Sequence, residues 1–371
     1  MKTGPDLTER QKEILTAVIE EFIATAEPVG SRSLTRRRSI QLSPATVRNA
    51  MADLEDLGLL SASHASAGRI PTVAGFRLYV ERLASRGRIS AKERELIQTL
   101  TQQSQENRDL RTVLKEAGRA LSTVSKHAAL VLMPSLDAVV FESVEFLPLR
   151  EATVLAIFVA KSGLIQHRVI DVSFPLERDE LNRMSNYLNS KLGGKTLIEV
   201  RAEILRTLDD ERSQADFMMR RALYLGEKAL SRSTDDATDL LVQGERTFLE
   251  HPEFADVPRM RKLLRAFEEK SLLVKLLDAA TAIDAQAASR AETTVVLGSE
   301  SSVRDLRDLA AVTARYVAED GSGGRVGVLG PTRMDYSRVI PLVEMTAQAV
   351  SDSLRRSAAS PEEPDSEPDD T

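Results

Sequence analysis

The segment SPATVRNAMADLEDLG, residues 43–58, decides the fold of the N-terminal part of the chain. Ser43 is a favourable helix N-cap residue, and Pro44 suits the first helical position, where no amide hydrogen is needed. Apolar residues then recur on one helical face, at Val47, Met51, Leu54 and Leu57. We therefore predict a helix that starts at Pro44, buries this face and ends before Gly58.

Two further helices are predicted before this segment. Thr8 and Gln11 form a capping-box pattern at the start of the first helix. Its apolar residues have helical spacing as far as Ala26, at Ile14, Leu15, Val18, Ile19, Phe22 and Ile23. The break at residues 27–30 contains a proline and a glycine, so it ends this helix, and residues 31–37 form a short second one.

The residues after the third helix predict a β-hairpin. Two short runs with strand character, 59–63 and 70–73, flank a stretch of small residues that ends in Gly68 and Arg69. This pattern fits a two-stranded wing with an arginine at its tip. Three helices followed by a wing predict a winged helix-turn-helix over residues 1–88.

The start of the third helix carries side chains that suit the reading of DNA bases. When such a helix lies in the major groove, the residues opposite its buried face contact base edges. Here these are Ser43, Ala45, Thr46, Arg48 and Asn49. Arginine recognises guanine and asparagine recognises adenine, and small residues fit thymine methyl groups.

Neighbouring arginines are predicted to hold the DNA backbone. Arg36, Arg37 and Arg38 precede the third helix, and Arg69 could clamp a phosphate or enter a minor groove. For any one of these residues, solvated surface charge is the alternative interpretation. The order of capped helices and wing favours DNA contact by the set as a whole.

The distribution of charge supports this interpretation although the whole chain is acidic. The formal net charge is -6, but six acidic residues and no basic ones lie in residues 360–371. Between residues 32 and 88, ten arginines stand against four acidic residues. The acidic, proline-rich tail, 357–371, is expected to be disordered, because it cannot bury a core.

The rest of the chain predicts a sheet domain interrupted by helices, so the fold class is α+β with several domains. Runs rich in valine, isoleucine and phenylalanine indicate consecutive strands of an antiparallel meander at 128–133, 138–146, 153–160 and 164–172. The pattern from 177 to 291 is mainly helical, with one strand expected near 240–242. Strands return at 293–297 and 325–329, with helices expected at 303–317 and 336–354.

Several classes of function find no support in the residues. The chain has no cysteine and no apolar run of 18 residues, and its N-terminus lacks a signal-peptide pattern, which favours a soluble cytoplasmic protein. Its four histidines have no metal-ligand spacing. The glycine-rich segment 321–330 lacks the Lys-Ser/Thr of a P-loop. Carboxylates such as Glu142 and Glu145 are interpreted as solvated charges, so no enzyme activity, catalytic residue, metal or cofactor is predicted.

Longer segments resemble one known family. LTERQKEILTAVIEEFIATAEPVGSRSL (7–34), LSPATVRNAMADLEDLGLL (42–60) and AGRIPTVAGFRLYV (67–80) resemble the N-terminus of the heat-inducible transcription repressor family HrcA. HPEF at 251–254 and LGPTRMDY at 329–336 are also similar to that family. The resemblance covers nearly all of the chain except the acidic tail.

This resemblance implies a homodimer that binds an inverted-repeat operator, called CIRCE, upstream of chaperone genes and represses them until heat shock. It also implies that the chaperonin GroEL keeps the repressor in its DNA-binding form. It also implies three domains: a winged helix, a GAF-like α/β domain in two pieces and a mainly helical inserted dimerization domain. The sequence pattern agrees with this order and places them at 1–88, at 89–190 with 291–356, and at 191–290. An alternative is a regulator whose GAF-like domain binds a small metabolite.

Overall fold

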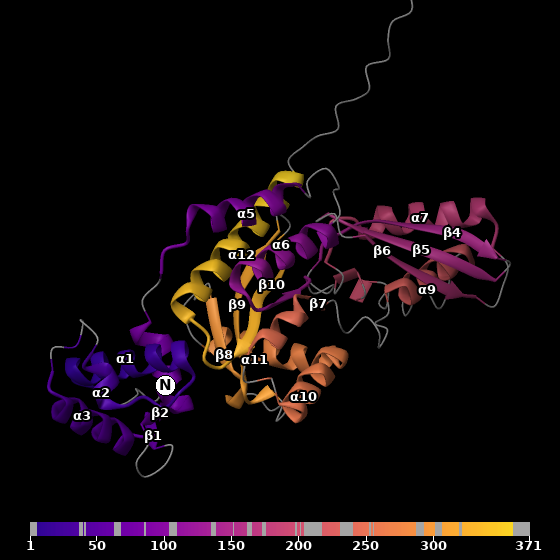
Figure 1. The fold of residues 1–371 in the computed structure, drawn as a ribbon. Coiled ribbons are helices and arrows are strands. Elements are labelled where there is room, and N and C mark those ends of the chain that lie inside the picture. Colours follow the sequence, from indigo (N-terminus) through magenta and orange to yellow (C-terminus); the bar gives the residue numbers. More distant parts are fainter. Residues whose placement is uncertain are drawn as a thin grey trace, which may run out of the picture.

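The computed structural model describes most of the chain: residues 6–36, 40, 42–62, 68–84, 87–103, 110–134, 139–150, 152–161, 165–172, 176–196, 199–200, 202–203, 217–230, 240–251, 254, 256–286, 293–300, 306–318 and 321–358. These residues form an N-terminal helical part with a small hairpin, a central sheet covered by helices, and a smaller sheet with its own helices (Figure 1). The arginines Arg37 and Arg38, the wing tip at 63–67 and the acidic tail from 359 onward lie outside the described residues.

The N-terminal part is a winged helix, as predicted. Its elements are α1 (Glu9–Thr25), α2 (Ser31–Leu34), α3 (Pro44–Asp56), β1 (Leu60–Ala62), β2 (Arg69–Pro71), α4 (Val73–Leu78) and the π-helix η1 (Tyr79–Leu83). Both hydrogen bonds of the capping box between Thr8 and Gln11 are present. The Ser43 side chain accepts from the Thr46 amide, and β1 pairs antiparallel with β2. The local sequence signals therefore placed these elements correctly.

The core of the winged helix comes from the predicted apolar faces. Ile14 and Ile19 of α1 and Leu54 of α3 are fully buried, together with Leu34 of α2. Gly75 in α4 is needed for this packing, because a Cβ there would lie 2.2 Å from the Leu59 carbonyl oxygen. Burial of each large aliphatic side chain contributes roughly 1.5–3 kcal/mol. This core is continuous with that of the central domain.

The central sheet is antiparallel, with the strand order β7-β3-β10-β9-β8 among the described residues. Its strands are β3 (Ala128–Leu132), β7 (Leu240–Gln243), β8 (Thr293–Leu297), β9 (Leu309–Val317) and β10 (Gly323–Pro331). One face packs against α6 (Leu110–Ser125) and α12 (Tyr336–Ala358), and α5 (Ala91–Gln103) packs on these two helices. The other face packs against α10 (Val257–Glu268) and α11 (Lys270–Gln286). This arrangement is the GAF-like domain. Both faces are covered, so successive residues of β3 and β10 are buried.

A second, smaller sheet lies apart from the central one (Figure 1). As far as it is described, it is a meander of β4 (Phe141–Arg150), β5 (Thr153–Ala160) and β6 (Ile165–Asp171), with α7 (Arg178–Leu192) and α9 (Phe217–Leu230) beside it. One of its faces is buried, as shown by Val144, Phe146, Val154, Ala156 and Phe158. We call this sheet with its two helices the small unit, and its opposite sheet face the outer face.

This topology corrects the predicted domain boundaries. The small unit, residues 139–230, lies between β3 and β7 of the central sheet, whereas the insertion was predicted at 191–290. The prediction placed β4 to β6 in one meander with β3, but β3 pairs with β7 and β10 instead. Conversely, α10 and α11 cover the central sheet. Apolar runs revealed the strands but not their partners, because strand pairing joins residues far apart in the sequence.

The predicted helix at 303–317 was also wrong. Residues 309–317 form β9, which pairs with β8 and β10. Its alanine-rich sequence, LAAVTARYV, suits a helix when it is taken alone. In the fold, small side chains such as Ala310, Ala311 and Ala314 are buried between two layers of helices, so tertiary packing overrides local propensity.

The winged helix contacts the central domain through the turn at 329–336. The Arg333 Nη1 atom donates to the Ile23 carbonyl oxygen at the end of α1 (2.7 Å), and the rings of Tyr336 and Phe76 are 6.5 Å apart. Arg77 of α4 donates to the Val295 carbonyl (2.9 Å). It also forms a two-bond ion pair with Glu300. The orientation of the winged helix is therefore coupled to the edge of the central sheet.

His251, the first residue of the HPEF motif, is connected to the same turn through His127. The imidazole rings of His251 and His127 stack with their centroids 5.2 Å apart. Burial lowers the pKa of His127 to about 4, and the His251 charge acts in the same direction, so this ring is neutral at physiological pH. A Cβ at Gly330 would lie 2.6 Å from the Met334 sulfur and 2.8 Å from His127 Nδ1. The turn is therefore tightly packed around Gly330, between Met334 and His127.

Candidate DNA-binding interface

The third helix presents the predicted reading residues to solvent. Val47, Met51 and Leu54 face the core, with 0%, 4% and 0% of their surface exposed. On the opposite side Ser43, Ala45, Arg48 and Asn49 are exposed and Thr46 is half-buried. The structure therefore brings all five predicted residues of α3 together at the start of one exposed helix face.

Ser43 and Thr46 position this helix end. The Ser43 hydroxyl accepts from the Thr46 amide at 3.1 Å, and the two hydroxyl groups are 2.9 Å apart. Ser43 therefore satisfies one of the first-turn amides. The positive end of the helix dipole at this terminus is a favourable place for a DNA phosphate.

Charge is divided along α3 in a way that suits DNA. Arg48 lies in its first half, whereas Asp53, Glu55 and Asp56 lie in its second half. An approach by the N-terminal half therefore brings cationic and neutral side chains to the phosphates and keeps the carboxylates away. Arg48 and Asn49, adjacent and exposed, are the side chains on this face that can make paired hydrogen bonds to bases.

Only some of the arginines predicted to hold the DNA backbone lie in the described part of the chain. Arg36 is exposed and lies in the turn that follows α2, before the chain enters α3. Arg32 in α2 is also exposed and was not among the predicted contacts.

Arg69 is placed at the base of the wing. It is the first residue of β2, and its backbone exchanges two hydrogen bonds with Val29. Its guanidinium lies 2.8 Å from Glu55 of α3, and 27% of the side chain is exposed. Glu55 also accepts from the Ala62 amide of β1 at 3.0 Å. Arg69 therefore ties the wing to α3, and a contact of its side chain with DNA stays a prediction.

The described residues show no competing site chemistry. Among them, His, Asp and Glu side chains form no group of three or more that could hold a metal ion. No helix in the described part of the chain is long and apolar enough to cross a membrane. Glu93 accepts hydrogen bonds from Ser90 at the start of α5 and from Arg338 of α12, so it links the two helices. The hydrogen bonds from Ser90, and then that from Arg338, lower the pKa of Glu93 to about 2. This carboxylate is therefore structural.

Three helices followed by a two-stranded wing, with the capped start of the third helix exposed, define a winged-helix DNA-binding protein of the transcription regulator class. The family model described as "Winged helix-turn-helix transcription repressor, HrcA DNA-binding" matches residues 6–82, and "HrcA protein C terminal domain" matches residues 111–340. The chain belongs to the HrcA family of heat-inducible transcription repressors, and its partner is DNA.

Full-length relatives and a solved structure agree with this. The chain is 44% identical over 346 residues to the heat-inducible transcription repressor HrcA of Geobacter sulfurreducens, covering 93% of this chain and 98% of the relative. It is 40% identical over 348 residues to that of Sorangium cellulosum, covering 94% and 98%. A crystal structure of a hypothetical protein at 2.2 Å resolution has the same fold, with a TM-score of 0.59, 23% identity and coverage of 95% and 100%.

Proposed function

We propose that this repressor binds, in the cytoplasm, an inverted-repeat operator of the CIRCE type upstream of chaperone genes, as a homodimer that heat stress releases. The observation that carries the proposal is α3, whose capped N-terminus presents Arg48 and Asn49 on an exposed face. A dimer with two such helices reads two half-sites about one helical turn, or a multiple of it, apart. Occupation of a promoter then blocks transcription sterically.

Replacement of Arg48 by alanine tests base reading. Because a two-bond contact to a base contributes about 1–3 kcal/mol, Arg48→Ala should weaken binding to the operator about 5- to 150-fold and leave a scrambled duplex unaffected. The measurement is fluorescence anisotropy with both duplexes at fixed physiological salt.

The matched control is Arg36→Ala. A phosphate contact has no sequence preference, so this change should weaken binding to both duplexes alike and reduce the salt dependence by about one counterion. An Arg48→Ala variant that loses affinity equally for both duplexes would show that Arg48 also holds only the backbone.

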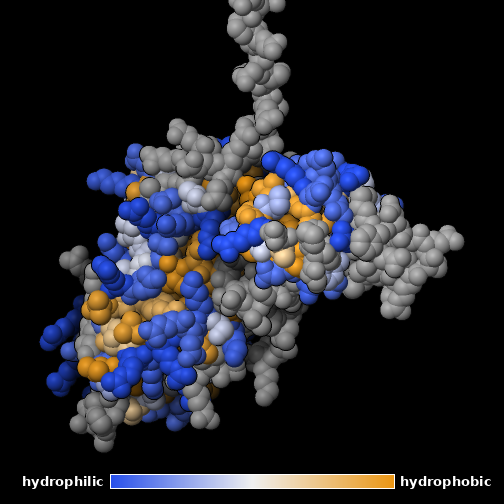
Figure 2. Space-filling model, turned by 90° about the vertical axis from the view of Figure 1, so that its right-hand side faces the viewer, coloured by the Kyte–Doolittle hydropathy of each residue, from blue (hydrophilic) through white to orange (hydrophobic). Residues whose placement is uncertain are grey.

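The outer face of the small unit supports the homodimer. Leu155, Ile157 and Val159 of β5 are half-buried there, and Ile165 and Val169 of β6 are 61% and 56% exposed. Figure 2 faces the end of the molecule that carries the small unit and shows apolar side chains gathered among hydrophilic ones. Large apolar side chains exposed side by side on a sheet are typical of protein–protein contact sites, so a second copy is the expected cover. We assign dimerization to residues 139–230 on this ground.

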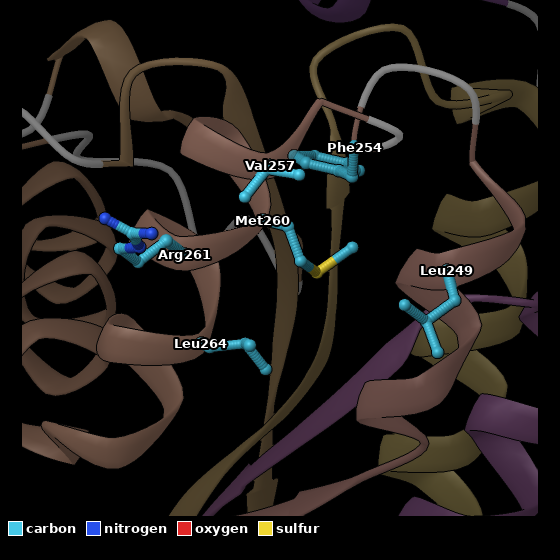
Figure 3. Close-up of a pocket in the computed structure, with 6 residues that line it drawn as sticks. All are labelled: Leu249, Phe254, Val257, Met260, Arg261 and Leu264. Carbon is cyan, nitrogen blue, oxygen red and sulfur yellow. The ribbon is translucent and has the colours of Figure 1, made fainter.

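A separate apolar pocket supports an interaction with the chaperonin GroEL. It is lined by Leu249, Phe254, Val257, Met260, Arg261 and Leu264. Leu249 lies on the 3-10 helix η4 (Glu245–Glu250), across from Met260 and Leu264 of α10 (Figure 3). Leu249, Val257 and Leu264 are 70%, 68% and 52% exposed, whereas Phe254 is buried. Exposed apolar surface is the general property that chaperones bind.

Removal of these leucines tests the chaperonin proposal. The double change Leu249→Ser and Leu264→Ser should lower the affinity for GroEL at least about tenfold, since it removes exposed apolar area without touching the core. Operator binding without chaperonin should not change. Leu149→Ser, which removes a leucine of the small unit that is 51% exposed, close to the 52% of Leu264, is the control. Undiminished chaperonin binding by the double variant would contradict the assignment of this pocket.

A further inference from the structure

Glu55 lies where α3 meets the wing. It belongs to the second half of α3, and its side chain is 31% exposed, whereas Asp53 and Asp56 on the same helix are exposed. Its Oε1 atom accepts from the Ala62 amide of β1 at 3.0 Å. Its Oε2 atom is 2.8 Å from Nη2 of Arg69 in β2. One carboxylate of α3 therefore contacts both strands of the hairpin.

The two residues that Glu55 contacts are opposite each other in the hairpin. Ala62 is the last residue of β1 and Arg69 the first of β2, and they are partners in the register. The backbone amide and carbonyl of Arg69 bond to Val29, at 2.8 and 2.9 Å. In an antiparallel pair the amide of the opposite residue then points away from the partner strand, here toward α3. Glu55 thus takes the place of a neighbouring strand on that side of β1.

The other attachments of the hairpin act on β2 and its end. The Thr72 hydroxyl donates to the Gly58 carbonyl at 2.7 Å, and the Thr72 amide donates to the Leu59 carbonyl at 3.1 Å. The bonds with Val29 hold the far edge of β2. A hairpin held only in these places can still tilt about β2. The bond from Ala62 to Glu55 acts on β1 and fixes this tilt relative to α3.

We propose that Glu55 positions the wing for DNA binding, and that Arg69 acts with it as a positioning residue rather than as a phosphate contact. The start of α3 and the wing touch DNA in two separate places, so both fit at once only when the angle between them is correct. An angle that is set before binding also removes the cost of ordering a loose wing on the DNA. Glu55 therefore increases the affinity for DNA although it is negatively charged.

The negative charge of Glu55 separates this role from simple electrostatics. A carboxylate repels the phosphates, so charge alone predicts that its removal strengthens binding to every duplex. Loss of the wing position predicts weaker binding instead. The two explanations thus differ in the sign of the effect.

Two variants of the full chain that remove the same charge test the proposal. Glu55→Ala loses both contacts, whereas Glu55→Gln keeps an acceptor for the Ala62 amide. In fluorescence anisotropy with the operator duplex, Glu55→Ala should bind about five- to tenfold more weakly, and Glu55→Gln should stay within about threefold of the unmodified chain. Asp53→Ala, which removes an exposed carboxylate of the same helix, is the control and should bind no more weakly than the unmodified chain. Equal or stronger binding by Glu55→Ala overturns the proposal.

A combination with Arg69→Met distinguishes positioning from a phosphate contact. When two residues act through one contact, their effects do not add, so the double variant Glu55→Ala with Arg69→Met should bind about as weakly as Glu55→Ala alone. The salt dependence of binding should be unchanged in Arg69→Met. Additive losses, with a salt dependence reduced by about one counterion, would show that Arg69 holds a phosphate and would overturn its assigned role.

Amide hydrogen exchange tests the contact between Glu55 and the hairpin directly. In Glu55→Ala, exchange should accelerate in β1 around Ala62 and stay unchanged in α3 around Met51. The affinity measurements rest on the operator of the proposed function, whereas exchange needs no DNA. Unchanged exchange at Ala62 overturns the inference. Accelerated exchange supports it even if the unmodified chain does not prefer the operator, a result that would count against the proposed function alone.

Discussion

Ile157→Asp should make the repressor monomeric and weaken its binding to the full operator about 100-fold or more. Ile157 lies at the middle of β5 on the outer face, where a carboxylate would have to be buried in each copy. A monomer engages one half-site at a time. It therefore loses the effective concentration that joins the two binding events, which accounts for 10²- to 10⁴-fold in linked systems.

The measurement compares a duplex with both half-sites and a duplex with one. Ile157→Asp should bind the single half-site as the unmodified chain does, because α3 is far from the small unit (Figure 1). Ile157→Val, which keeps the apolar surface, is the matched control and should retain full operator affinity. A monomeric variant that still binds the full operator tightly would contradict the link between dimerization and repression.

Tyr336→Ala should lower the free energy of unfolding by about 3–5 kcal/mol, the cost of a large cavity at a buried aromatic position. Tyr336 is fully buried at the start of α12, and its hydroxyl donates to the Thr332 carbonyl at 2.6 Å. Burial raises its pKa far above the ordinary value of 10, so this hydroxyl stays a donor. Its ring also contacts Phe76, and the change should therefore loosen the winged helix from the central domain.

Denaturant unfolding gives the size of this effect, and amide hydrogen exchange gives its location. Exchange should accelerate first in α4, around Phe76. Tyr336→Phe keeps the ring and loses only the hydrogen bond to Thr332, so it should cost about 1 kcal/mol. If the alanine variant is no less stable than the phenylalanine variant, the ring does not support the contact between the two domains.

The predictions that succeeded concern residues close in the sequence. The N-caps Thr8 and Ser43 and the apolar face of α3 specify helix ends and a buried side through interactions within a few residues. The same local pattern identified the exposed face with Arg48 and Asn49. The winged helix and the exposed face of α3 could therefore be derived without knowledge of the rest of the fold.

What only the tertiary structure decided depends on contacts between distant residues. The strand β9 has the composition of a helix and becomes a strand because β8 and β10 pair with it. The partners of β3, and with them the limits of the small unit, follow from pairing across more than 100 residues. Arg69 appeared to be a wing-tip residue until the fold placed it beside Glu55. Caps and periodicity act locally, whereas sheet order and ion pairs are set by the packing of the whole chain.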